Sequence, residues 1–121
     1  MMEATAVIQQ HPYLNYNEQR ALEHIVLSVI PRYPVIRQVL LYGSKARGNF
    51  TEDSDIDLLF VTDDVLPRTK KFDISDAIYE AEVKHDVVVS AIFVSVQDFK
   101  TGGTPFLKRA QNEGIVLWSR E

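Results

Sequence analysis

The chain has 121 residues, of which 45% are hydrophobic and 25% charged, and it contains no cysteine. This is the size of one domain and the composition of a globular protein, and it excludes disulfides, thiolate metal sites and cysteine nucleophiles. The formal net charge of −4 gives no overall attraction to nucleic acid, which is therefore not an expected partner. No apolar run approaches the roughly 20 residues of a membrane span, and the first residues lack a secretory pattern, so we expect a cytoplasmic protein that does not associate with membranes.

The N-terminal part of the chain divides at residue 15. Residues 1–14 show no clean hydrophobic period and are expected to be a flexible arm, whereas residues 15–121 are expected to form a single domain. The segment Asn15–Glu18 has the pattern of a capping box, and apolar residues then recur at the spacing of one helical face. We therefore predict a helix of about four turns, which Pro31 and Pro34 end.

Two apolar segments in the middle of the chain are predicted to be strands. Val35–Tyr42 is rich in β-branched and aliphatic residues, and Ile56–Val61 is apolar on both faces. Between them, Ser44–Arg47 is expected to form a short helical turn and Gly48–Ser54 a polar loop.

The C-terminal half alternates between helix and strand. Arg68–Lys84 is predicted to be helical and Asp86–Val96 to be a long strand. Thr104-Pro105 provides a helix start and Gly114 a helix end, and Ile115–Trp118 is then a short final strand. The pattern predicts an α/β (α+β) fold with a small mixed sheet of about four strands flanked by helices.

The candidate functional residues lie at the end of one predicted strand and at the starts of two others. Gly43 and Ser44 follow a strand and precede a helical turn, an arrangement that lets a phosphate approach the backbone. Asp55 and Asp57 stand at the mouth of the next strand, where side chains two residues apart share a face. Asp86 opens a third strand, and if that strand lies beside the second, three carboxylates meet. Such a cluster requires a cation, and carboxylate oxygens favour hard divalent ions.

These motifs resemble those of a known family. The run Gly43–Gly48 with Ser54–Leu58 looks like the Gly-Ser, ten residues, Asp-x-Asp signature of the DNA polymerase β-like nucleotidyltransferases. The short length and the ending Phe106–Trp118 are similar to the minimal (MNT) nucleotidyltransferase domains of bacteria and archaea. The resemblance covers residues 35–118 and implies the polymerase β-like nucleotidyltransferase fold.

The resemblance also implies roles for particular residues. Asp55 and Asp57 match the family's metal-binding carboxylates, and Asp86 is placed as the third, which would orient or deprotonate the acceptor. Gly43 and Ser44 match the residues that hold the β- and γ-phosphates of the nucleotide. The implied reaction uses ATP as the substrate and two Mg²⁺ ions, and it transfers a nucleoside monophosphate to a hydroxyl group.

Two cations lie in the same loop. Lys45 and Arg47 are expected to bind the nucleotide by neutralising phosphate charge, although Arg47 could equally brace the loop by pairing with an acidic side chain.

The acceptor is expected to be another protein. Small domains that resemble this chain are commonly paired with a helical HEPN protein as antitoxin to toxin, and some adenylylate a tyrosine of that partner. An antitoxin that adenylylates a tyrosine of a HEPN-type partner is therefore the favoured hypothesis.

Other readings of the same residues remain open. The chain could be a non-catalytic module that antagonises a partner by contact alone, or its acceptor could be a small molecule such as an aminoglycoside, or an RNA end. Asp55 and Asp57 could cap a loop before a strand, and Asp86 could be a turn residue. The exposed edges of so small a sheet are compatible with either a homo-oligomer or a hetero-oligomer.

Overall fold

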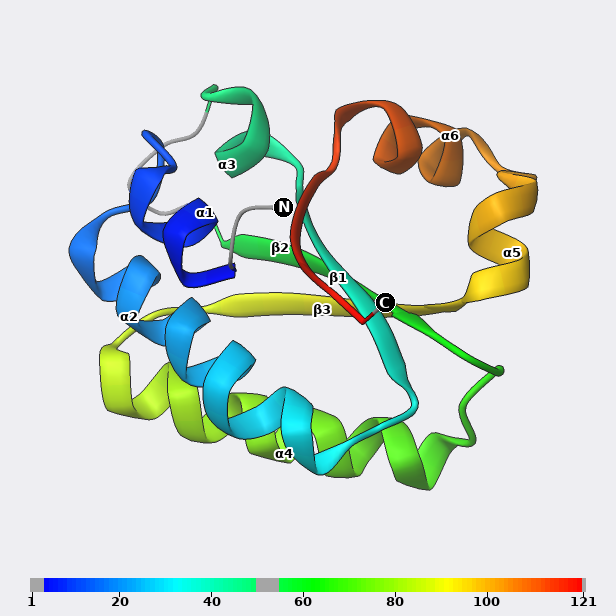
Figure 1. Cartoon of the computed structure of the whole chain (residues 1–121), viewed down its shortest axis with the longest axis horizontal. Helices are drawn as coiled ribbons and strands as arrows, with labels where there is room; N and C mark the ends of the chain where they lie inside the picture. Colours follow the sequence, from blue (N-terminus) through cyan, green and yellow to red (C-terminus); the bar gives the residue numbers. More distant parts are fainter. Residues whose placement is uncertain (1–3, 50–54, 121) are drawn as a thin grey trace.

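The computed structural model describes residues 4–49 and 55–120, and these form a four-stranded mixed sheet with helices on both faces (Figure 1). The strand order is β3-β2-β1-β4; β1 is antiparallel to β2 and to β4, and β2 is parallel to β3. The fold is the predicted mixed α/β arrangement. The strands are β1 (Ile36–Tyr42), β2 (Ile56–Thr62), β3 (Val89–Ser95) and β4 (Ile115–Ser119).

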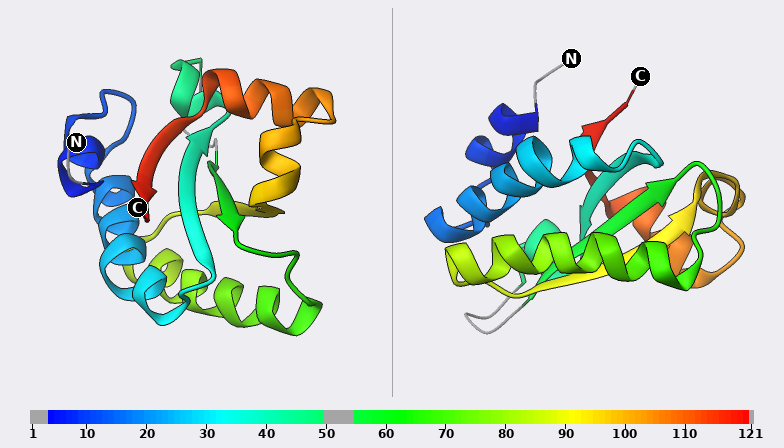
Figure 2. Two further views of the ribbon diagram at one scale, coloured as in Figure 1. Left: turned by 45° about the vertical axis from the view of Figure 1, so that its right-hand side comes forward. Right: turned by 90° about the horizontal axis from the view of Figure 1, so that it is seen from below.

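The helices cover both faces of the sheet (Figure 2). The α-helices are α1 (Ala4–Gln10), α2 (Tyr16–His24), α3 (Ser44–Arg47), α4 (Arg68–His85), α5 (Val96–Thr101) and α6 (Pro105–Glu113). Of these, α1, α2 and α4 lie on one face, and α5 and α6 lie on the other. α2 continues as a π-helical turn, η1 (Ile25–Val29), and a 3₁₀ turn, η2 (Ile30–Arg32). Within residues 4–49 and 55–120, no helix combines the length and the apolar character that crossing a membrane requires. Positions 50–54 of the predicted polar loop lie outside the described residues.

The predicted capping box starts α2. The Asn15 side chain accepts a hydrogen bond from the Glu18 N–H at 2.8 Å, and the Glu18 carboxylate accepts one from the Asn15 N–H at 2.9 Å. The helix tightens into η2 at Pro31, because proline has no N–H with which to continue the α-helical hydrogen bonds. The start, length and end of this helix therefore agree with the sequence pattern.

The N-terminal segment that was expected to be a flexible arm contains a helix. Residues Ala4–Gln10 form α1, and the side chain of Ile8 is fully buried. Ala4 and Val7 pack against the same core cluster that contains Ile8, so the apolar residues of this short segment recur at helical spacing. The segment is too short for its period to be distinguished from chance in the sequence, and tertiary packing stabilises it.

The sheet carries an apolar layer on each face. On one face, Leu41, Leu58 and Phe60 pack with the buried side chains of α2, η1 and α4. On the other face, Leu59 and Val61 pack with Ala110 and the side chains of α5 and α6. Both central strands are therefore buried on both sides, which explains their continuous apolar sequences.

The third strand begins later than the sequence predicts. α4 extends to His85 and ends at Asp86, whose φ of 55° places it in the left-handed conformation of a helix end. The strand was expected to start at Asp86, but the pairing with β2 starts at Val89, opposite Ile56. The strand also ends early, because the Ser95 side chain caps α5 by accepting from the Asp98 N–H at 3.1 Å.

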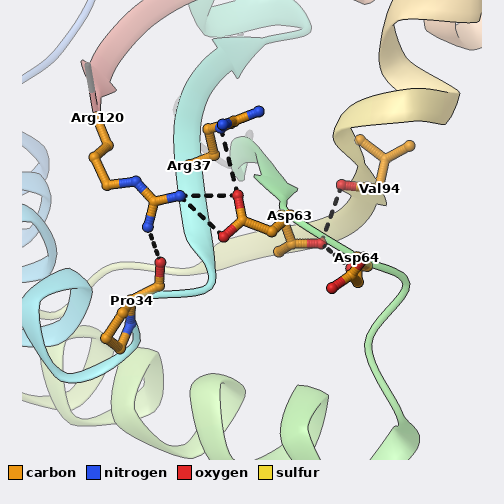
Figure 3. Close-up of polar contacts among 7 residues, drawn as sticks. Pro34, Arg37, Asp63, Asp64, Val94 and Arg120 are labelled. Carbon is orange, nitrogen blue, oxygen red and sulfur yellow. Dashed lines mark hydrogen bonds and ion pairs between the residues drawn. The ribbon is translucent and has the colours of Figure 1, made fainter.

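A cluster of charges joins three strands at the end of the sheet away from Gly43 (Figure 3). The Asp63 carboxylate accepts two hydrogen bonds from the Arg120 guanidinium, at 2.8 and 2.9 Å, and lies 3.4 Å from Arg37 Nε. Arg120 also donates to the Pro34 carbonyl. These contacts fasten the C-terminal strand to the ends of β1 and β2, a structural role that the sequence does not reveal.

A histidine pair joins α2 to α4 and makes stability depend on pH. His24 Nδ1 and His85 Nε2 lie 3.3 Å apart. Burial, and then the neighbouring His24, Lys84 and Arg20, lower the pKa of His85 from its ordinary value of 6.5. The folded state binds a proton at His85 less tightly than the unfolded chain does. The contribution of neutral His85 to the free energy of unfolding is therefore fully present above pH 6.5 and is lost as the pH falls through the folded pKa.

We therefore expect the urea midpoint to fall when the pH is lowered from above to below 6.5. The His24→Gln/His85→Gln variant should lose part of this dependence, and His11, whose pKa burial also lowers, should retain the rest. Identical pH profiles for the variant and the wild type would contradict the role of the pair.

Candidate functional site

The site is built around Gly43, which joins β1 to α3. Its φ of 74° is a conformation that side-chain-bearing residues rarely adopt, and its carbonyl accepts from the N–H groups of Ala46 and Arg47, each at 3.1 Å. The Gly48 N–H donates to the Ser44 carbonyl at 2.8 Å and closes the single turn of α3. The strand at Gly43-Ser44 leads directly into a helical turn as the sequence predicts, and the role of this turn in phosphate binding stays a prediction.

Asp57 lies directly against this turn. It pairs with Tyr42 across β1 and β2, and a Cβ added at Gly43 would overlap Asp57 Oδ2. The absence of a side chain at Gly43 therefore leaves the space that the carboxylate occupies. The Gly-Ser and Asp-x-Asp motifs, ten residues apart in the sequence, meet at one end of the sheet.

This contact predicts the effect of substitution at Gly43. A Gly43→Ala variant places a methyl group where Asp57 Oδ2 lies and forces an unfavourable φ, so we expect loss of nucleotide binding. Gly103→Ala is the matched control, because a Cβ added at Gly103 would lie 4.0 Å from the nearest atom, which is an ordinary van der Waals distance. Nucleotide titration by calorimetry measures the effect; unchanged affinity in Gly43→Ala would show that the turn is not part of the site.

The electrostatics of the site favour a cation. Burial and then the charge of Asp55 raise the pKa of Asp57, and only Arg47 lowers it. Neither Asp55 nor Asp57 makes a hydrogen bond or ion pair with another described residue. Two carboxylates with unused oxygen atoms, one of them half-buried, are the donor set that Mg²⁺ and similar hard ions require. Asp55 and Asp57 therefore fit a divalent metal.

Asp86 is not brought to this pair. Its exposed position at the end of α4 lies before β3, and the β3 residue opposite Asp57 is Ser90. Over residues 4–49 and 55–120, no three histidine or acidic side chains are grouped so as to hold a metal ion. The sequence did not reveal this because α4 needs a left-handed residue to end, which delays the strand.

The two loop cations have different environments. Lys45 Nζ lies 2.9 Å from Glu18 Oε2, and the two side chains are only 4% and 7% exposed. Lys45, predicted to bind nucleotide, thus forms a buried ion pair that joins α3 to α2. Arg47 is half-exposed and lies 3.4 Å from Glu113 Oε2 on α6, which is the bracing contact that the sequence left open.

A pocket of about 170 Å³ opens beside Gly43. Phe106 and Tyr42 meet edge to face there, with ring centroids 5.3 Å apart. Burial, followed by the charge of Asp57, raises the pKa of Tyr42 to about 12, so its hydroxyl stays protonated. The lining residues are Tyr42, Gly43, Arg47, Phe106, Arg109, Ala110 and Glu113.

The α6 side of this pocket was missed by sequence reasoning. Phe106, Arg109, Ala110 and Glu113 recur at the spacing of one helical face, a signal from which no site residue was predicted. Arg109 makes no ion pair with any described residue. It adds a second cation, besides Arg47, to the pocket beside Gly43.

This chain is similar in sequence to known proteins. Residues 25–121 match the family model described as "Polymerase beta, Nucleotidyltransferase". The chain is 35% identical over 105 residues to a Methanocaldococcus jannaschii protein named "Putative protein adenylyltransferase MJ0604", covering 84% of this chain and 99% of that protein.

Solved structures share the fold. A toxin-antitoxin complex with AMP-PNP contains a chain that superposes with a TM-score of 0.60 at 18% identity, covering 82% of this chain and 73% of that one. A complex described as a tri-AMPylated Shewanella oneidensis HEPN toxin with an MNT antitoxin gives a TM-score of 0.51 at 16% identity, covering 86% and 73%.

Proposed function

This chain belongs to the polymerase β nucleotidyltransferase family, and we propose that it transfers AMP from ATP to a tyrosine hydroxyl of a HEPN-type partner, thereby acting as an antitoxin. The observation that carries the proposal is the contact of Asp57 with the Gly43-Ser44 turn, because a cation held by Asp57 would lie beside a phosphate bound at that turn. The similar proteins support the choice of acceptor: one carries the name "Putative protein adenylyltransferase", and a solved structure of the same fold is a complex of an MNT antitoxin with an AMPylated HEPN toxin.

In this proposal each residue of the site has a separate role. Gly43 and Ser44 hold the outer phosphates through backbone N–H groups, and Arg47 and Arg109 neutralise their charge. Asp55 and Asp57 would hold Mg²⁺, which when bound would neutralise charge on the phosphates and lower the pKa of the acceptor hydroxyl. The acceptor hydroxyl gives its proton to solvent, its oxygen forms a bond to the α-phosphorus, and the bond from that phosphorus to the β-phosphate oxygen breaks to release pyrophosphate.

The direct test is the mass of the partner. The chain is co-expressed with the product of the adjacent gene, purified, and incubated with ATP and Mg²⁺, and intact masses of both proteins are recorded. We expect one or more AMP units on the partner, absent in Asp55→Asn/Asp57→Asn and retained in Asp76→Asn, whose carboxylate lies on the exposed side of α4. Peptide mapping then identifies the modified side chain. Unchanged masses with ATP still bound would contradict protein adenylylation.

The pocket gives a separate prediction for nucleotide affinity. Arg109→Gln removes a cation from the pocket, and a charge-assisted hydrogen bond contributes about 1.5–3 kcal/mol. Because Arg109 is exposed, we expect the lower end, a weakening of ATP binding by about tenfold. Lys108→Gln, on the same helix but outside the pocket, is the control. Equal ATP affinities for the two variants would exclude Arg109 from phosphate binding.

A further inference from the structure

Ser90 occupies the place on β3 that faces the carboxylate pair. In the strand register, Tyr42 of β1 pairs with Asp57 of β2, and Asp57 pairs with Ser90 of β3. Side chains of residues paired on neighbouring strands point to the same face, and neighbouring strands lie about 4.7–4.9 Å apart. Asp57 therefore has Tyr42 on one side and Ser90 on the other.

The packing of the sheet confirms that these side chains share a face. Leu59 and Val61 follow Asp57 at alternate positions and pack in the apolar layer against α5 and α6. Val94, four residues after Ser90, packs in the same layer. Ser90 is half-buried at the uncovered end of this face, beside Asp57.

Asp86 is held elsewhere by the backbone. Its N–H donates to the Glu82 carbonyl as the last bond of α4, and the Val87 N–H bonds to the same carbonyl at 3.1 Å. The first hydrogen bond to β2 comes just before the pairing starts at Val89, where the Val88 carbonyl accepts from the Ile56 N–H at 2.9 Å. Asp86 thus belongs to the helix end and lies before the first residue of β3 that reaches β2.

We propose that Ser90, and not Asp86, completes the cation site on β3, so that the site consists of two carboxylates and a hydroxyl. This inference rests on the proposed function of the Asp55–Asp57 pair. A site with two carboxylates carries one negative charge fewer than a site with three, and divalent ions bind more tightly to sites with more carboxylates. The free protein therefore binds a divalent ion weakly, and the phosphates of the nucleotide supply the missing charge.

Binding of Mn²⁺ tests the proposal without relying on activity. Free Mn²⁺ is measured by electron paramagnetic resonance with the full chain, in the presence and absence of a non-hydrolysable ATP analogue. Ser90→Asp adds the third carboxylate, and we expect it to tighten Mn²⁺ binding without nucleotide by about tenfold or more. Asp86→Asn should leave the affinity within about twofold of the wild type.

A second variant uses the absence of cysteine from the chain. Ser90→Cys provides a single thiol beside Asp57, and Cd²⁺ should then give a thiolate-to-cadmium absorption band that is lost in Ser90→Cys/Asp57→Asn. Ser75→Cys, on the exposed side of α4, is the matched control and should not form this site. This measurement remains informative if the extra carboxylate of Ser90→Asp impairs folding.

The outcomes separate this inference from the proposed function. If Ser90→Asp gains Mn²⁺ affinity but the wild type transfers no AMP, the result supports the role of Ser90 and contradicts the proposed activity. An active wild type whose Mn²⁺ affinity falls in Asp86→Asn, and does not rise in Ser90→Asp, overturns the role of Ser90 and keeps the activity. Equal cadmium bands in Ser90→Cys and Ser75→Cys also overturn it.

Discussion

Replacing Asp57 by asparagine is expected to abolish nucleotidyl transfer and, at the same time, to stabilise the protein without ligand. Metal-mediated charge stabilisation contributes several kcal/mol to the transition state, which corresponds to a loss of about a thousandfold or more in rate. The fold is stabilised because burial and Asp55 disfavour the charged form of Asp57, and asparagine removes that charge.

The pH dependence gives the sign of this second effect. Since the pKa of Asp57 is raised in the folded protein, the wild type loses stability, relative to Asp57→Asn, as the pH rises through that folded pKa. Urea unfolding of both proteins at several pH values measures the difference, and Asp76→Asn serves as the exposed control. A variant that keeps its transfer rate, or that is less stable than the wild type in the absence of metal, would contradict the assignment of Asp57.

The second large effect concerns the buried ion pair of Lys45 and Glu18. Lys45→Met leaves the Glu18 carboxylate charged in the interior, and removing one partner of a buried pair costs about 3–5 kcal/mol. The Glu18→Gln/Lys45→Met variant should recover most of this loss, because glutamine is uncharged and still closes the capping box. Urea denaturation measures both values.

An exposed ion pair provides the comparison. Arg32→Met breaks the contact with Glu80, at 3.4 Å between half-exposed or exposed side chains, and should cost less than about 1 kcal/mol. If Lys45→Met costs no more than Arg32→Met, the pair of Lys45 and Glu18 is not a buried constraint. If folded Lys45→Met instead loses ATP affinity as strongly as Arg109→Gln, Lys45 contacts phosphate.

The parts of the fold that the sequence predicts correctly depend on patterns among neighbouring residues. The capping box at Asn15, the apolar segments of β1 and β2, and the Thr104-Pro105 helix start each involve neighbouring residues, and each appears in the structure. The spacing of Gly43, Ser44, Asp55 and Asp57 also depends mainly on two adjacent strands, so their convergence could be expected.

The parts of the site that were not foreseen depend on contacts between distant segments. The burial of Lys45 depends on Glu18, which lies on another helix. The displacement of Asp86 depends on where α4 ends and on the register of β3 with β2. Arg109 reaches the pocket because α6 lies beside the end of β1. None of these relations appears in the period or composition of a single segment.

The ion pair between Lys45 and Glu18 gives the phosphate-binding turn a thermodynamic link to the N-terminal helices. The turn is joined through α3 to α2, and α1 packs against both α2 and β4. A molecule that displaced α2 would separate Glu18 from Lys45 and remove this contact between α2 and α3. If that separation weakened nucleotide binding at the Gly43-Ser44 turn, bound nucleotide would weaken the binding of that molecule by the same factor.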